Sequence, residues 1–192
     1  QADWSLFDGN ADVQSAIKKF YDGKSSELNK IGTEIKEKIN QGFKDNVLTF
    51  DEEKEISTLI AERQKVLDEL AKSEYDIKMG ALQLEAQEKA KLNGGALTPE
   101  TYNEIMEKAK EVVETYNANS RETYSAKQEL LKKLYPKGGA KYDEELRSAK
   151  ESYISSLGEA SARLAEFGTN TEQATYGDTL KKAQEQKDKL IK

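Results

Sequence analysis

The segment Val47–Ile56, with the sequence VLTFDEEKEI, returns in altered form as Ala96–Ile105, with the sequence ALTPETYNEI. Leu, Thr, Glu and Ile occupy the same offsets in both copies. Each Thr is placed to accept a hydrogen bond from a free N–H of a first helical turn. Glu52 completes a capping box behind Thr49, and Pro99 fits a first helical position, where its missing N–H costs nothing. The repeat therefore predicts long helices joined by capped turns, an arrangement typical of proteins that span or scaffold.

A looser third copy of this turn begins at Gly138-Gly139-Ala140, which matches Gly94-Gly95-Ala96. Such glycine pairs could offer backbone N–H groups to an anion. Glycines are also the usual residues at helix ends, and we interpret both pairs in that way.

The composition agrees with a chain of long helices. Of the 192 residues, 36% are hydrophobic and 34% are charged, with only 2 Pro. Such a mixture is typical of helices with wide solvent-exposed faces, so the core should consist of narrow apolar seams. The net charge is -6 with both signs interspersed, which excludes a basic surface for nucleic acid. No apolar run approaches the roughly 18 residues of a membrane helix.

Two reactive residue types are missing from the chain. It contains no Cys and no His, which excludes thiol nucleophiles and disulfides and removes the commonest general base and transition-metal ligand. We therefore expect no enzyme activity, no catalytic residues, no bound metal and no cofactor. The chain starts at Gln1 without Met and ends in mid-pattern, so we expect a fragment of a longer protein, from which a leader could have been removed.

Helical spacing divides the chain into three regions. Residues 1–9 form an apolar lead with Trp4, Leu6 and Phe7, either a strap that docks on the bundle or a linker that anchored a preceding domain. Residues 10–135 form a long helical hairpin region, and residues 136–192 form a C-terminal helical pair continuous with the bundle. The expected helices are 11–41, with a weak point at Gly23, then 50–92, 99–135, 142–167 and a last helix after a break at Gly168-Thr169-Asn170.

The short connections favour antiparallel neighbours. The fold class is therefore all-α, with long antiparallel helices in elongated hairpins, coiled-coil-like seams and no strands. The sequence leaves open whether the seams close within one chain or between chains. The residues expected to line them are Val13, Ile17, Phe20, Leu28, Ile31, Ile35, Ile39, Ile56, Leu59, Ile60, Val66, Leu67, Leu70, Ile77, Leu82, Leu84, Tyr102, Ile105, Ala109, Val112, Tyr116, Leu130, Leu134, Leu146, Ala149, Tyr153, Leu157, Leu164, Ala174, Leu180, Ala183 and Leu190.

Two segments imitate known binding loops. Residues 45–52 look like the second half of an EF-hand, but the first and third loop positions fall on Gln41 and Phe43, and Phe cannot bind calcium. Gly23-Lys24-Ser25 imitates the end of a P-loop but has Lys18 where the first glycine belongs. We interpret the first as a capped helix–turn–helix and the second as a chance match.

Carboxylate clusters and tyrosines are the other candidates for a site. The carboxylates, for example Glu85/Glu88, alternate with Lys on outward faces, so we expect solvated salt-bridge faces. The chain contains nine Tyr, and six of them, Tyr102, Tyr116, Tyr124, Tyr135, Tyr142 and Tyr153, fall mostly on the seams. We expect these rings to fill space in the seams, with sugar stacking or an interface role as the alternative.

The phrase from Gly42 to Ile56, followed by a long Lys/Glu/Leu helix, resembles passages in tail tape-measure proteins of phages and prophages from Gram-positive bacteria. In those proteins, segments of the form Asp-Gly-x-Leu-Thr-x-Glu-Glu join long helices, and this chain departs from that form at Asn46 and Ala96. The resemblance covers residues 40–110 best and is extended by the aromatic lead around Trp4. It implies an internal piece of a long helical protein that bundles in several copies inside the tail tube and sets tail length.

The sequence thus supports a structural spacer in a phage tail, located in the virion or in the bacterial cytoplasm during assembly. Its expected partners are other copies, through the helical seams, or other tail and structural proteins, with no nucleic acid and no membrane segment. The alternative is a bacterial surface or secreted helical binding module, which predicts a stable monomer with an exposed apolar or tyrosine-rich patch. An enzyme would need a site made of carboxylates alone and a cleft to hold it.

Overall fold

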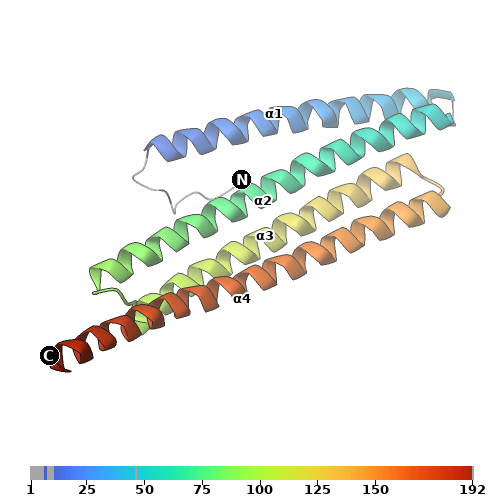
Figure 1. The fold of residues 1–192 in the computed structure, drawn as a ribbon. Coiled ribbons are helices and arrows are strands. Elements are labelled where there is room, and N and C mark those ends of the chain that lie inside the picture. The colour runs from blue at the N-terminus through green and yellow to red at the C-terminus, as the bar shows by residue number, and fades with distance from the viewer. Residues whose placement is uncertain (1–6, 8–10, 46, 192) are drawn as a thin grey trace. The chain divides into compact units, whose positions relative to one another are not determined.

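A computed structural model describes the backbone of residue 7 and of residues 11–45 and 47–191, and the side chains of these residues except 172–186 and 191. The fold is all-α: α1 (Ala11–Gly42), a short 3-10 turn η2 (Phe43–Asp45), α2 (Phe50–Leu92), α3 (Pro99–Leu134) and α4 (Ala140–Ile191). Consecutive helices pack antiparallel, and the described residues form no strand (Figure 1). The apolar lead of residues 1–9 lies outside the described residues, apart from Phe7.

The chain forms two compact units. Unit 1 consists of Gln1–Glu74 and Asn117–Leu157, and unit 2 of Tyr75–Tyr116 and Gly158–Lys192. Because α2, α3 and α4 each cross from one set of residues to the other, both units contain segments of these three helices.

The core of unit 1 is a seam of aliphatic side chains. Ile35, Ile56 and Leu131 are fully buried, and half-buried residues such as Leu70 and Leu130 pack against the seam. The seam predicted from α1 and the first half of α2 is confirmed, except that Phe20 is 40% exposed. These seams close within one chain.

The core of unit 2 differs from the predicted seam in which face of α2 is buried. Leu82 and Ile105 are fully buried, as the apolar spacing predicts, but Leu84 is 62% exposed. In α2 the buried face continues from Ala71 through residues 75, 78 and 82 to Ala86. This spacing is close to the 3.6-residue turn of a straight helix, and a strict seven-residue step drifts off such a face. The prediction for Leu84 was wrong because it continued the heptad from Leu70. Leu190, also predicted on a seam, is 87% exposed, and the side chains of Ala174, Leu180 and Ala183 lie outside the described residues.

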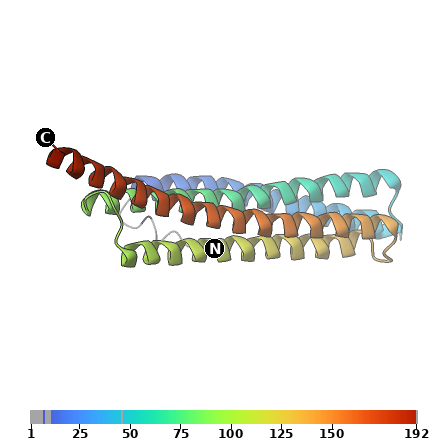
Figure 2. The ribbon, with the colours of Figure 1, turned by 60° about the horizontal axis from the view of Figure 1, so that its bottom comes forward.

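The predicted turns are confirmed in detail, and Figure 2 shows the tight connections they form. The amide of Glu52 donates to Thr49 Oγ1 (3.2 Å) and the amide of Thr49 donates to Glu52 Oε1 (3.1 Å), a complete capping box. The amide of Thr101 donates to Thr98 Oγ1 (3.1 Å). Gly94, Gly95, Gly138 and Gly139 all have positive φ, which explains why these turns use glycine.

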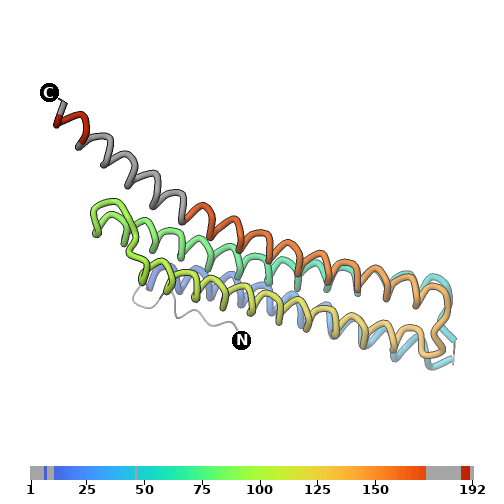
Figure 3. Tube along the Cα trace, turned by 90° about the horizontal axis from the view of Figure 1, so that it is seen from below, coloured from blue at the N-terminus to red at the C-terminus, as the bar shows by residue number. Residues whose placement is uncertain are grey.

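Two predicted helix breaks are absent. α1 runs through Gly23, and α4 runs through Gly168-Thr169-Asn170 without a break (Figure 3). α4 is a single helix of 52 residues, in place of the predicted C-terminal pair. Gly168 is buried, its carbonyl accepts a hydrogen bond from the Tyr102 hydroxyl (3.3 Å), and a Cβ there would lie 3.0 Å from Met106 Cε. The glycine therefore serves close packing of α4 on α3, not a turn.

Gly42, at the end of α1, makes a testable contribution to unit 1. A Cβ at this buried position would overlap Leu48 and come within 2.9 Å of Glu52 Oε2, a member of the capping box. We expect Gly42→Ala to lower the free energy of unfolding by about 1–2 kcal/mol, because the turn must shift to admit the methyl group. Gly32→Ala, where a Cβ meets nothing within 4 Å, should raise it by about 0.5–1 kcal/mol. Urea unfolding of both variants measures the difference, and equal effects would contradict the close contact.

Candidate functional site

The two segments that imitate binding loops lie in ordinary helical structure. Asp45 belongs to η2, and Thr49 and Glu52 form the capping box described above, so the calcium-like segment is a helix–turn–helix connection. Gly23-Lys24-Ser25 lies inside α1, and Lys24 pairs with Glu69 of α2 (3.2 Å). A P-loop needs a strand before it and a helix start after it, and this segment has neither.

Of the carboxylates that the sequence singles out, Glu85 takes part in two salt bridges. Glu85 Oε1 lies 3.0 Å from both Lys89 Nζ and Lys108 Nζ. Burial tends to raise the pKa of Glu85, but the hydrogen bonds and charges of the two lysines outweigh it and hold the pKa below its usual range. An ionised, doubly paired carboxylate is a poor general acid. Among the described residues, no group of three or more acidic side chains is arranged to hold a metal ion.

Unit 1 contains a polar cleft where the first turns of α2 and α4 meet the end of α3. It has a volume of about 450 Å³. Glu53 Oε1 accepts hydrogen bonds from the Tyr135 hydroxyl and from Lys141 Nζ, both at 3.2 Å. Ser57 Oγ donates to Glu145 Oε1 (3.0 Å). Because these interactions tie the three helices together, the cleft acts as a polar clasp.

The tyrosines pack along the seams, as the sequence predicts. The six singled out are all half-buried. Five of the six form edge-on or tilted ring pairs within a unit: Tyr124 with Tyr153 and Tyr135 with Tyr142 in unit 1, and Tyr116 with Tyr75 in unit 2. Ring centroids in these pairs lie 5.2–6.4 Å apart, the usual range for aromatic pairs.

The raised pKa values of two tyrosines in unit 1 predict how the free energy of unfolding depends on pH. Burial and the charges of Glu145 and Glu53 raise the pKa of Tyr135 well above its ordinary value, and burial and Glu74 do the same for Tyr21. A raised pKa in the folded state means that the stabilisation is fully present below the unfolded pKa of about 10 and is lost as the pH rises above it. We expect the free energy of unfolding to fall steeply above about pH 10.

Denaturant unfolding across this pH range, with tyrosinate absorbance recorded in parallel, measures the effect. In Tyr135→Phe the hydrogen bond to Glu53 is lost, so this variant should be less stable at neutral pH by about 1 kcal/mol. Above pH 10 its stability should fall less steeply than that of the parent. An unchanged slope would show that Tyr135 ionises as easily in the folded chain as in the unfolded one.

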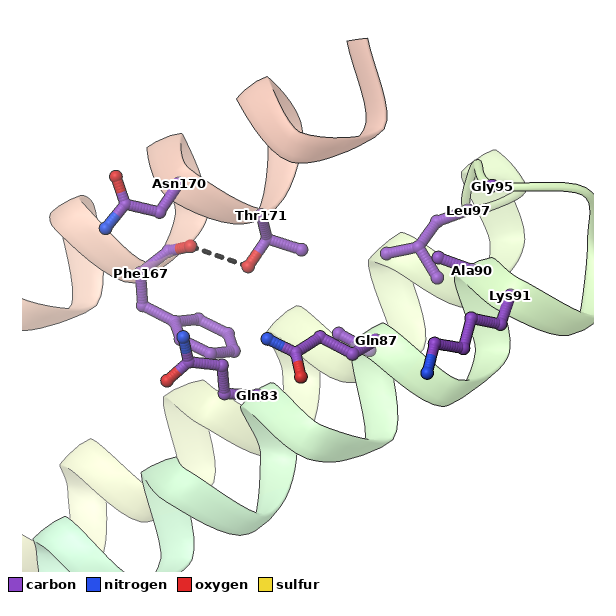
Figure 4. Close-up of a pocket in the computed structure, with 10 residues that line it drawn as sticks. Gln83, Gln87, Ala90, Lys91, Gly95, Leu97, Phe167, Asn170 and Thr171 are labelled. Carbon is purple, nitrogen blue, oxygen red and sulfur yellow. Dashed lines mark hydrogen bonds between the residues drawn. The ribbon is translucent and has the colours of Figure 1, made fainter. Parts of the chain in front are cut away.

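Unit 2 contains a cavity of about 320 Å³ between the last turns of α2 and the middle of α4, at residues 167–171 (Figure 4). Ala86, Ala90, Leu97 and Phe167 supply its apolar surfaces, and Gln83, Gln87, Lys91 and Asn170 supply polar groups. Gln87 extends from α2 toward the Phe167 ring, and Thr171 Oγ1 donates to the Phe167 carbonyl (2.7 Å). Among the described residues that line it, Lys91 is the one ionisable side chain. These residues have the chemistry to hold an apolar group, and they include no pair of groups for acid–base chemistry.

Sequence reasoning missed a set of buried polar side chains. Glu74, Lys78 and Thr123 are buried, and Tyr75 is buried with a hydroxyl that has no hydrogen-bond partner among the described residues. A signal was present, since residues 71, 74, 75, 78 and 82 of α2 recur at the three- and four-residue steps of a buried face. Because residues 74 and 78 are charged, we did not interpret this spacing as a buried face.

None of the helices in the described part of the chain combines the length and apolar character that a membrane span requires. Comparison of the sequence with protein-family models and with curated proteins, and of the fold with solved structures, finds no match.

Proposed function

We propose that this chain is a structural helical spacer or scaffold segment of a larger protein. The observation that carries the proposal is that the interactions described above join helices to one another or cap their ends. Apolar side chains form the seams, Thr49 and Thr98 cap helices, and the carboxylates at the polar clasp and at Glu85 hold helices together. These contacts give long, firmly joined helices, and α2 alone spans about 64 Å.

The specific form of the proposal is a segment of a phage tail tape-measure protein from a Gram-positive host. It rests on the resemblance of residues 40–110, including the capped Leu-Thr turns. In that setting the segment contributes to tail length, and it is found in the virion or, during assembly, in the bacterial cytoplasm. Its partners are other copies of itself or other tail proteins, and it has no catalytic role.

Light scattering on the eluting protein, with small-angle X-ray scattering on the same peak, tests the spacer role. Because the described seams close within one chain, we expect a monomer of 21.6 kDa at low concentration. Its maximum dimension should be at least about 64 Å, the length of α2. A monomer too small to contain a straight helix of that length would count against a spacer.

The tape-measure setting has a separate test. An in-frame deletion of this segment from the parent gene should shorten the tails seen by electron microscopy, because tape length sets tail length in proteins of that family. Tails of unchanged length would remove this setting and leave the general spacer role in place.

The cavity in unit 2 favours one alternative, a bacterial surface or secreted helical binding module. Its apolar lining, formed by Ala86, Ala90, Leu97 and Phe167, could accept a side chain of a partner protein. Ala90→Trp would fill this space. Loss of binding to a cell-surface extract in that variant, with unfolding unchanged, would move the binding module ahead of the spacer.

A further inference from the structure

The α2–α3 seam contains a buried polar contact in unit 1. Glu74 is 6% exposed, and its Oε2 accepts a hydrogen bond from Asn119 Nδ2 (2.9 Å). One turn further along α3, the buried Thr123 hydroxyl donates to the Asn119 carbonyl (2.9 Å), so this hydroxyl is satisfied within α3. A carboxylate that is almost fully buried is costly unless a donor meets it.

α1 also contacts α2 within one turn of Glu74. The hydroxyl of Tyr21 donates to the Leu70 carbonyl of α2 (3.0 Å), one turn before Glu74. The charge of Glu74 also contributes to the raised pKa of Tyr21, after the larger effect of burial. Three helices therefore meet around one buried carboxylate.

The apolar pattern alone leaves the pairing of α2 with α3 ambiguous. Apolar residues recur every three or four residues in both helices, so sliding α3 by one heptad along α2 again sets apolar residues against apolar residues. Such a slide moves the α2–α3 turn along the chain by about half a heptad. One helix then loses only about one helical turn at that end. The cap at Thr98 and the partly exposed Glu85–Lys108 salt bridge also oppose the slide, but both lie toward the end where α2 turns into α3.

The polar contact breaks this ambiguity. In either shifted pairing, Glu74 faces Val112 or Ala126 instead of Asn119, and Asn119 faces Leu67 or Ala81. Each of these partners lacks a side-chain donor for the carboxylate. The shifted pairings would thus bury a charge with no hydrogen bond from the facing helix, which the interior penalises strongly.

We propose that the Glu74–Asn119 hydrogen bond is a register lock, which selects one pairing of α2 with α3 from several that the apolar seam allows. The lock contributes specificity more than stability, as buried polar residues do in coiled coils. It goes beyond the spacer role and does not depend on it. Any function that requires a defined hairpin benefits from it.

The absence of cysteine from the chain permits a direct test. Asp68 and Lys127 lie about two turns from Glu74 and Asn119, in opposite directions along the antiparallel pair, so cysteines at 68 and 127 report the native pairing. Burial raises the pKa of Asp68, and the charge of Lys127 opposes that rise, as expected of neighbouring side chains. Cysteines at 68 and 120 report the pairing shifted by one heptad. Both pairs are treated with a short bismaleimide, in the parent and in a Glu74→Leu/Asn119→Leu background, and the cross-linked fractions are compared.

In the parent we expect cross-linking at 68/127 alone. In the double-leucine background the 68/120 product should rise by about tenfold or more, while circular dichroism shows helix content retained or increased. Glu74→Gln keeps the size of the side chain and an oxygen acceptor, so it should retain the native pairing. Asn103→Leu/Glu107→Leu places the same two substitutions at exposed positions of α3 and should also retain it.

Native cross-linking alone in the double-leucine background would overturn the proposal, because the apolar seam would then fix the register without help. Loss of helix in that background would overturn it as well, since the contact would then be needed for folding rather than for register. Shifted cross-linking in Asn103→Leu/Glu107→Leu would show that added leucine, and not the lost hydrogen bond, causes the slide.

Discussion

Leu82→Asp should lower the free energy of unfolding by about 4 kcal/mol, whereas Leu84→Asp should change it by no more than about 0.5 kcal/mol. The two leucines are two residues apart in α2, so their local helical environment is similar and only their burial differs. Leu82 is 0% exposed in the core of unit 2, and Leu84 is 62% exposed. Aspartate at 82 would remove an apolar side chain from the core and bury a charge in its place.

Urea unfolding followed by circular dichroism measures both variants under one set of conditions. A loss of 4 kcal/mol is a large part of the stability of an ordinary domain, so Leu82→Asp should be close to unfolded at room temperature. Equal losses in the two variants would mean that the seam continues along the heptad from Leu70. In that case the buried face of α2 described above is wrong.

Gly168→Pro should lower the free energy of unfolding by about 3 kcal/mol or more. α4 is continuous at this position, so proline would remove a helical hydrogen bond and its ring would clash with the preceding turn. The ring would also face Met106, which already lies 3.0 Å from the site of a Cβ. Thermal unfolding and helix content measure the effect.

Alanine substitutions separate the two parts of this prediction. Gly158→Ala, also inside α4, meets nothing within 4 Å and should be stabilising by about 0.5–1 kcal/mol. Gly168→Ala should fall short of that gain, because the new methyl group presses on Met106. If Gly168→Pro instead melts like the parent, the chain turns at residues 168–170, as the glycine in the sequence first suggested.

The candidate-site residues show where sequence reasoning reached its limit. Thr49, Glu52 and Thr98 were assigned correctly, because a cap depends on residues three positions apart and needs no distant contact. The polar clasp could not be found, because Ser57 and Glu145 lie 88 positions apart in the chain. The sequence offers no way to tell Glu74 from a solvated carboxylate, because its partner Asn119 is on α3, 45 positions away.

By itself, the sequence determined the all-α class, the bounds of α2 and α3 to within a residue or so, and the chemistry of the turns. These features follow from local periodicity and capping, which act over a few residues. Only the tertiary structure decided that the seams close within one chain, that Leu84 faces solvent and that α4 passes through Gly168 without a break. The physical reason is that each depends on which helix lies alongside, and the same local pattern allows several neighbours.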